Sequence, residues 1–158
     1  MADANHAYGA APARPVEIAH GALRGAIAAM AMTGMRNVTT GLGIVKETPP
    51  IAIVRQRALG LSKKVPRKRR RAATELFHWG YGAAGGAVFA ALPAQVRQAP
   101  WAGPAYGLAV WIGFEMGIAP VLGLDLGKRE RAAERFAFAL DHLLYGFVLS
   151  ETRRRPQG

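Results

Sequence analysis

Apolar stretches of helical length alternate with polar connections along the chain. These stretches cover residues 18–35, 72–92, 103–124 and 132–149. Apolar runs of about 20 residues that border on arginines are typical of membrane-spanning helices. The pattern therefore predicts an all-α protein, a four-helix transmembrane bundle that occupies residues 17–152 as one domain.

The polar segments predict how such a bundle would be oriented. Residues 1–16 and 153–158 are interpreted as tails, and residues 37–71 as a long basic connection interrupted at Pro49 and Pro50. Basic connections face the cytoplasm, so we expect a multi-pass protein of the inner (plasma) membrane whose basic block binds anionic lipid headgroups. Those basic residues are Lys63, Lys64, Arg67, Lys68, Arg69, Arg70 and Arg71. The same block could serve as a nucleic-acid patch, but its position against an apolar stretch disfavours nucleic acid as the partner.

Glycines recur at intervals of four residues within the apolar stretches. In a helix this spacing places them on one ridge, where another helix can approach closely. We therefore expect helix packing within the chain, and association with a second copy or with a membrane partner. The glycines are Gly21, Gly25, Gly82, Gly86, Gly103, Gly107, Gly113 and Gly117.

A short pattern occurs twice and suggests two related helical hairpins, with chance similarity as the alternative. Both copies have His, Tyr and Gly at i, i+3 and i+4, along one helix face. They are His78, Tyr81 and Gly82, and then His142, Tyr145 and Gly146.

Ionisable residues inside the apolar stretches are the candidate chemical groups. Glu115 lies near the middle of residues 103–124, where a carboxylate needs a partner. If residues 103–124 and 132–149 form an antiparallel hairpin, Glu115 and Asp141 lie at similar depth. We expect a proton- or ion-binding cluster of Glu115, Asp141, His142, His78 and Glu75; an interhelical hydrogen bond is the structural alternative.

Composition limits the chemistry further. The 158 residues carry a net charge of +11 and contain no cysteine, which excludes disulfides, thiolate metal sites and a cysteine nucleophile. Haem ligation by His78 and His142 is disfavoured because they lie at different distances from the preceding arginines. No phosphate-binding loop or nucleophile elbow is present. We predict no catalytic residue, metal or cofactor, and no enzymatic activity.

The order of several short motifs resembles the YagU-like family of small bacterial inner-membrane proteins. The resembling features are Gly21-Ala22-Leu23-Arg24-Gly25, Pro49-Pro50, His78-Trp79, Gly103-x-x-x-Gly107 with Pro120, and the segment from His142 to Glu151 and Arg153-Arg154. The long basic connection departs from that family's pattern. The resemblance implies a multi-pass membrane protein with a link to acid tolerance and no assigned reaction.

These observations predict a non-enzymatic helical bundle that associates with itself or with a partner. One alternative is a proton- or small-ion-translocating protein that uses the Glu/Asp/His cluster. The other is a basic, soluble, helical protein that binds nucleic acid.

Overall fold

The computed structural model describes residues 14–44, 66–121 and 132–151. Within these ranges the chain is helical and contains no strand, which confirms the predicted all-α class. The elements are α1 (Pro15–Gly41), α4 (Arg67–Ala91), α5 (Ala94–Gln98), α6 (Ala102–Gly113), the π-helical turn η1 (Phe114–Ile118), α7 (Ala119–Val121) and α8 (Ala132–Glu151).

Prolines define several helix ends. Pro15 opens α1, where its missing N–H leaves no intrahelical bond unmade. Leu92 adopts an extended backbone (ψ 152°) directly before Pro93, because the proline ring disfavours a helical conformation in the preceding residue. Pro93 thus ends α4 and begins the short connection through α5 to α6.

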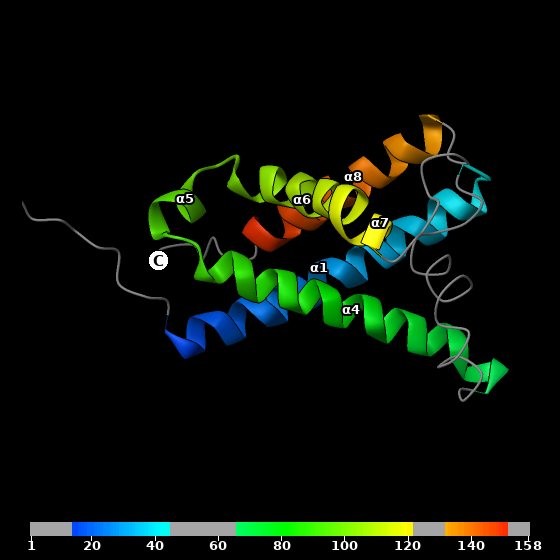
Figure 1. The fold of residues 1–158 in the computed structure, drawn as a ribbon, viewed down its shortest axis with the longest axis horizontal. Coiled ribbons are helices and arrows are strands. Elements are labelled where there is room, and N and C mark those ends of the chain that lie inside the picture. Colours follow the sequence, from blue (N-terminus) through cyan, green and yellow to red (C-terminus); the bar gives the residue numbers. More distant parts are fainter. Residues whose placement is uncertain (1–13, 45–65, 122–131, 152–158) are drawn as a thin grey trace, which may run out of the picture.

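The long helices form two closely packed pairs, α1 with α4 and α6 with α8 (Figure 1). Helix α8 also packs against α1, which joins the two pairs. The core between them contains Ala28 and Met32 of α1, Phe89 of α4, and Tyr145 and Leu149 of α8. Small residues predominate at the helix crossings, so the backbones approach closely and leave little room for large side chains.

Glycines form the crossing of α1 and α4. A Cβ on Gly25 would collide with the carbonyl oxygen of Gly82, and a Cβ on Gly86 would collide with that of Gly21. Each of these four positions therefore requires glycine for the observed helix separation.

The pair α6 and α8 packs in the same manner. A Cβ on Gly103 would meet the carbonyl oxygen of Gly146, and one on Gly107 would meet that of His142. In contrast, no atom lies within 4 Å of a Cβ added to Gly113 or Gly117, so these two predicted packing positions make no such contact.

The predicted transmembrane character is wrong for the described residues, because none of their helices has both the length and the apolarity needed to cross a bilayer. Helix α6 ends after 12 residues, α4 is rich in glycine and contains ionisable side chains, and ionisable side chains also interrupt the apolar residues of α8. Helix α4 begins at Arg67, and α1 continues through Arg36 to Gly41. This finding contradicts the multi-pass topology and the inner-membrane location, and with them ion transport across a bilayer.

The third apolar stretch, which is the most hydrophobic in the sequence, is divided in the structure. Helix α6 ends after 12 residues at Gly113 and is followed by the five-residue π-helical turn η1. A π turn changes the number of residues per turn and shifts the side chains that follow to another face of the helix. Lys63, Lys64, residues 1–13 and most of the predicted connection 37–71 lie outside the described residues.

Candidate functional site

A network of polar side chains lies between α1, α4 and α8, and Thr33 of α1 is at its centre. The Thr33 hydroxyl accepts hydrogen bonds from Arg36 Nη2 (2.9 Å) and from Trp79 Nε1 (3.2 Å). Its own proton is within reach of Glu75 Oε2 (3.0 Å) and of the Ala29 carbonyl oxygen (3.2 Å). One hydroxyl thus uses both its donor and its acceptor capacity to connect α1 with α4.

Arg36 is the buried cation of this network. Its side chain extends from the last turns of α1, and the residue is 6% exposed. Nη2 lies 3.5 Å from Oε2 of Glu75, an ion pair between α1 and α4. Burial lowers the pKa of Arg36, whereas the charges of Glu75 and Asp141 raise it. An isolated guanidinium would be costly at this position, so its carboxylate partners are a condition for its burial.

Asp141 of α8 is the second carboxyl group near Arg36. It is 3% exposed, and its Oδ1 atom has no hydrogen-bond partner. Burial raises the pKa of Asp141 to about 7, although the charge of Arg36 acts in the opposite direction. The carboxyl group therefore titrates near neutral pH, far above its ordinary range.

Two histidines complete the cluster. Burial, together with the charges of Arg36 and His142, lowers the pKa of His78 to about 3. Burial also lowers the pKa of His142, whose Nδ1–H donates to the Phe138 carbonyl oxygen at 2.8 Å. Nε2 of His78 has no hydrogen-bond partner. Both imidazoles are therefore neutral at pH 7.

The structure groups most of the predicted cluster around Arg36 and does not bring Glu115 to it. Among the described residues, the hydrogen-bond partner of Glu115 is Trp111, whose Nε1–H donates to Oε1 at 3.1 Å. Both residues belong to the segment formed by α6 and η1. The expected pairing of Glu115 with Asp141 or His142 is not present: equal sequence distance from the connection predicts equal depth only for two regular helices, and the π turn η1 interrupts the first of them.

The sequence interpretation missed Thr33 and Arg36. The apolar pattern predicts a helix that ends at residue 35, but α1 continues past Arg36. A signal was available: Gly25, Ala29, Met32 and Arg36 follow each other at intervals of four, three and four residues. This spacing continues the buried ridge of α1 and places the arginine on its inner face.

The two copies of the His/Tyr/Gly pattern have different surroundings. Tyr145 is 3% exposed and donates a hydrogen bond to the Gly82 carbonyl oxygen, whereas Tyr81 is 44% exposed. Gly82 and Gly146 both lie at helix crossings. The glycines are thus equivalent in position, and the tyrosines are not.

A search of the described residues finds no group of three or more His, Asp or Glu side chains positioned to hold a metal ion. The cluster instead contains one cation, two carboxyl groups, two neutral imidazoles and a hydroxyl. The carboxyl and imidazole groups among them can bind and release protons.

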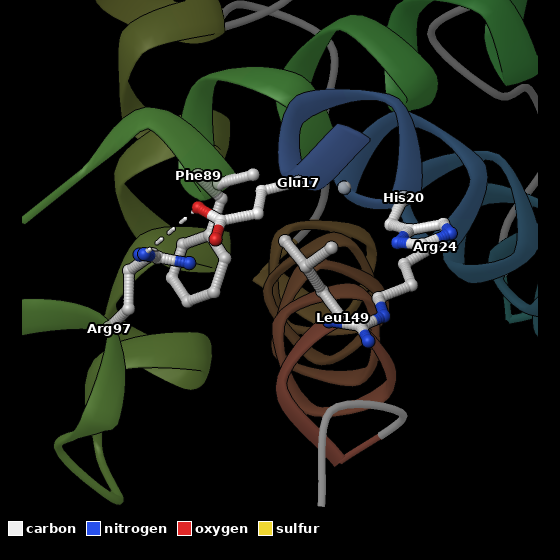
Figure 2. Close-up of a pocket in the computed structure, with 8 residues that line it drawn as sticks. Glu17, His20, Arg24, Phe89, Arg97 and Leu149 are labelled. Carbon is white, nitrogen blue, oxygen red and sulfur yellow. Dashed lines mark ion pairs between the residues drawn. The ribbon is translucent and has the colours of Figure 1, made fainter. Parts of the chain in front are cut away.

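A pocket of about 200 Å³ lies at the opposite end of α1 from the polar cluster (Figure 2). Glu17 and Arg97 face each other on one side of it at 4.0 Å, and His20 and Arg24 lie on the other side. Phe89 and Leu149 contribute apolar lining. Of the predicted site residues, Gly21 is the one that lines this pocket.

The outward faces of the helices carry large apolar side chains. Phe77 of α4 is 81% exposed, and Leu76 and Val88 of the same helix are more than half exposed. Basic residues at the start of α4 are also exposed, namely Lys68, Arg69 and Arg71. Exposed apolar and basic side chains thus lie together on α4.

Comparison with protein-family models, curated proteins and solved structures finds no match to this chain. The resemblance to the YagU-like family therefore stays a prediction.

Proposed function

We propose that this protein is a non-enzymatic helical bundle that binds an acidic protein partner through the outer face of α4. The observation that carries the proposal is the exposure of Phe77 on an apolar stripe beside a cluster of basic residues.

The stripe follows from helical geometry. Ala84 and Val88 follow Phe77 by seven and eleven residues, which places all three on one side of α4 at about 100° per residue. Leu76 broadens this side, and Arg69 precedes Leu76 by seven residues and shares its direction. The opposite side of α4 contains buried Gly82, Gly86 and Phe89, so the two faces are clearly separated.

We call the residues Arg69, Leu76, Phe77, Ala84 and Val88 the α4 face. Its apolar side chains suit an amphipathic helix docked along α4, the mode in which anchors at helical spacing enter an apolar surface. The adjacent basic residues and the net charge of +11 favour a partner with carboxylates next to its apolar anchors, and they disfavour association with a second, equally basic copy.

A defined probe tests this proposal. Fluorescence anisotropy would compare a labelled amphipathic peptide that carries glutamates on its polar face with a peptide that has the same apolar face and lysines instead. We expect the acidic peptide to bind at least tenfold more tightly, and added salt to weaken its binding.

Two variants locate the contact. Phe77→Ser should weaken binding of the acidic peptide about tenfold, because truncating a buried aromatic anchor costs more than about 1 kcal/mol. Phe136→Ser is the matched control, since Phe136 is a comparably exposed phenylalanine on α8. Circular dichroism would show that both variants remain helical.

Three results would contradict the proposal. They are equal binding of the two peptides, equal loss of binding in the two variants, and a homodimer that Phe77→Ser dissociates. Flotation of the protein with anionic lipid vesicles, abolished by Phe77→Ser, would assign the α4 face to a lipid surface and would also reject the protein partner.

A further inference from the structure

We propose that Asp141 is a proton-binding site whose charge state decides whether Arg36 pairs with Glu75 on α4 or with Asp141 on α8. This inference concerns the interior of the bundle and does not depend on the proposed partner.

The charges around Arg36 do not balance if every carboxyl is ionised. Arg36 is the cation that acts on the cluster, and two carboxyl groups, those of Glu75 and Asp141, act on it electrostatically. If both carboxyls were ionised, the single charge of Arg36 could not compensate both, and a carboxylate left buried without a bonded cation is strongly unfavourable in a protein interior. One carboxyl must therefore hold a proton over part of the neutral pH range.

Of the two carboxyls, Asp141 rather than Glu75 holds the proton. The hydrogen bonds of the Arg36 guanidinium go to Thr33 and Glu75, and Thr33 also bonds to Glu75. Asp141 is more deeply buried than Glu75, and its Oδ1 lacks any hydrogen-bond partner. Desolvation therefore disfavours its ionised form most, and the proton resides on Asp141.

The charged and titratable groups near Arg36 and Asp141 come from several helices, and none of them contradicts this assignment. Helix α1 contributes Arg36, helix α4 contributes Glu75 and His78, and His142 is next to Asp141 on α8. On α6 and η1, Tyr106 donates to the Gly85 carbonyl oxygen and Glu115 accepts from Trp111. Both imidazoles are neutral near pH 7, so no second cation from these residues compensates Asp141.

The Arg36 guanidinium therefore has two alternative ion-pair partners, Glu75 and Asp141. When Asp141 loses its proton to water, its carboxylate attracts Arg36, which bonds α1 to α8 at the expense of the bond to α4. When the proton returns, Arg36 pairs with Glu75. The proton thus shifts Arg36 between the α1–α4 and α1–α8 contacts.

The test is a carboxyl titration by NMR of protein with ¹³C-labelled aspartate. The sequence contains three aspartates, Asp3, Asp125 and Asp141, so the Asp141 signal is assigned by its loss in Asp141→Asn. We expect the wild-type Asp141 carboxyl to titrate near pH 7. The guanidinium nitrogen signals of Arg36 should change with the same midpoint.

The Glu75→Gln variant tests whether the proton affinity of Asp141 depends on the pairing of Arg36 with Glu75 or on burial alone. Without the Glu75 carboxylate, Arg36 is available to Asp141, and the proton affinity of Asp141 should fall at least tenfold. Glu115→Gln is the matched control and should leave the titration of Asp141 unchanged, because Glu115 pairs with Trp111.

Three outcomes would overturn the proposal. The first is a wild-type Asp141 that titrates at its ordinary acidic value. The second is an Arg36 signal that does not follow the Asp141 midpoint, and the third is a Glu75→Gln variant with an unchanged Asp141 titration. The first two use the wild-type protein, so they decide the matter even if Glu75→Gln does not fold.

Discussion

Tyr145 on α8 donates a hydrogen bond of 2.8 Å to the carbonyl oxygen of Gly82 on α4, although the two residues are 63 positions apart in the sequence. Burial raises the pKa of the tyrosine hydroxyl above its ordinary value, so it remains a donor at any physiological pH. A Cβ on Gly85 would collide with the tyrosine hydroxyl, so the absence of a side chain at Gly85 leaves room for this bond. This bond joins the α1–α4 pair to α8 in the buried part of the bundle.

Removal of this hydroxyl should destabilise the protein. Tyr145→Phe keeps the ring and deletes one buried hydrogen bond, so we expect the free energy of unfolding to fall by about 1 kcal/mol. Urea unfolding followed by circular dichroism would measure the change. Tyr81→Phe is the control, because Tyr81 is 44% exposed, and its stability should change by less than about 0.5 kcal/mol. Equal effects would show that the Tyr145–Gly82 bond is not a distinct stabilising contact.

A methyl group at the α1–α4 crossing should be more harmful than one on the outer face of α4. Gly25→Ala places a Cβ against the Gly82 carbonyl oxygen and should cost about 1–3 kcal/mol through overpacking. No atom lies within 4 Å of a Cβ at Gly80, so Gly80→Ala should stabilise α4 by about 0.5–1 kcal/mol. Thermal unfolding of the two variants should shift in opposite directions. A neutral Gly25→Ala would mean that the helices are further apart than described.

Loss of the Thr33 hydroxyl should destabilise the polar cluster. Thr33→Val has nearly the same shape but removes the acceptor used by Arg36 and Trp79 and the donor used by Glu75, so we expect a cost of about 2 kcal/mol. Thr40→Val is the control, because Thr40 is exposed on the same helix. Chemical unfolding would compare the two variants. A cost for Thr40→Val as large as that for Thr33→Val would indicate a general effect of valine in α1.

The buried histidines should make the protein less stable in acid. The pKa of His78 is lowered to about 3 in the folded state from an ordinary value of 6.5, so the unfolded state binds a proton in this window and the folded state does not. Stability attributable to His78 is therefore complete above pH 6.5 and decreases as the pH falls towards 3. His78→Gln should flatten this dependence by about 2–3 kcal/mol between pH 7 and 4.5.

The pKa shift of Asp141 changes stability with pH in the opposite direction to that of His78. The two effects must therefore be measured separately. Its folded pKa is raised to about 7 from 3.8, so its contribution to stability is greatest below pH 3.8 and is lost as the pH rises through 7. The His78 effect is best measured in an Asp141→Asn background, where urea unfolding between pH 4 and 8 should show stability rising with pH. A flat profile there would show that the histidines are not protonated on unfolding in this range.

The sequence determined the all-α class and the positions of the small residues that let helices pack closely. Periodicity of apolar positions and glycines at four-residue spacing are local properties, and they place Gly25 and Gly82 on helix ridges without knowledge of the fold. The tertiary structure decided which ridges meet: Gly21 and Gly25 face Gly82 and Gly86, and Gly113 faces no neighbour within the 4 Å limit. Such pairing depends on how the helices cross, which sequence spacing does not encode.

In the polar cluster, too, the sequence predicted some members and the tertiary structure decided the others. The sequence indicated Glu75, His78, Asp141 and His142, because ionisable residues among apolar ones need partners. It also placed Glu115 with them, and it ended the first helix one residue before Arg36. Helix boundaries are set by tertiary packing as well as by local propensity, and packing extends α1 to Gly41 and inserts a π turn at Phe114–Ile118. Only the tertiary structure places Arg36 in this cluster. Its charge is stabilised there by contacts with residues about 40 positions away in the sequence, and sequence spacing does not predict such contacts.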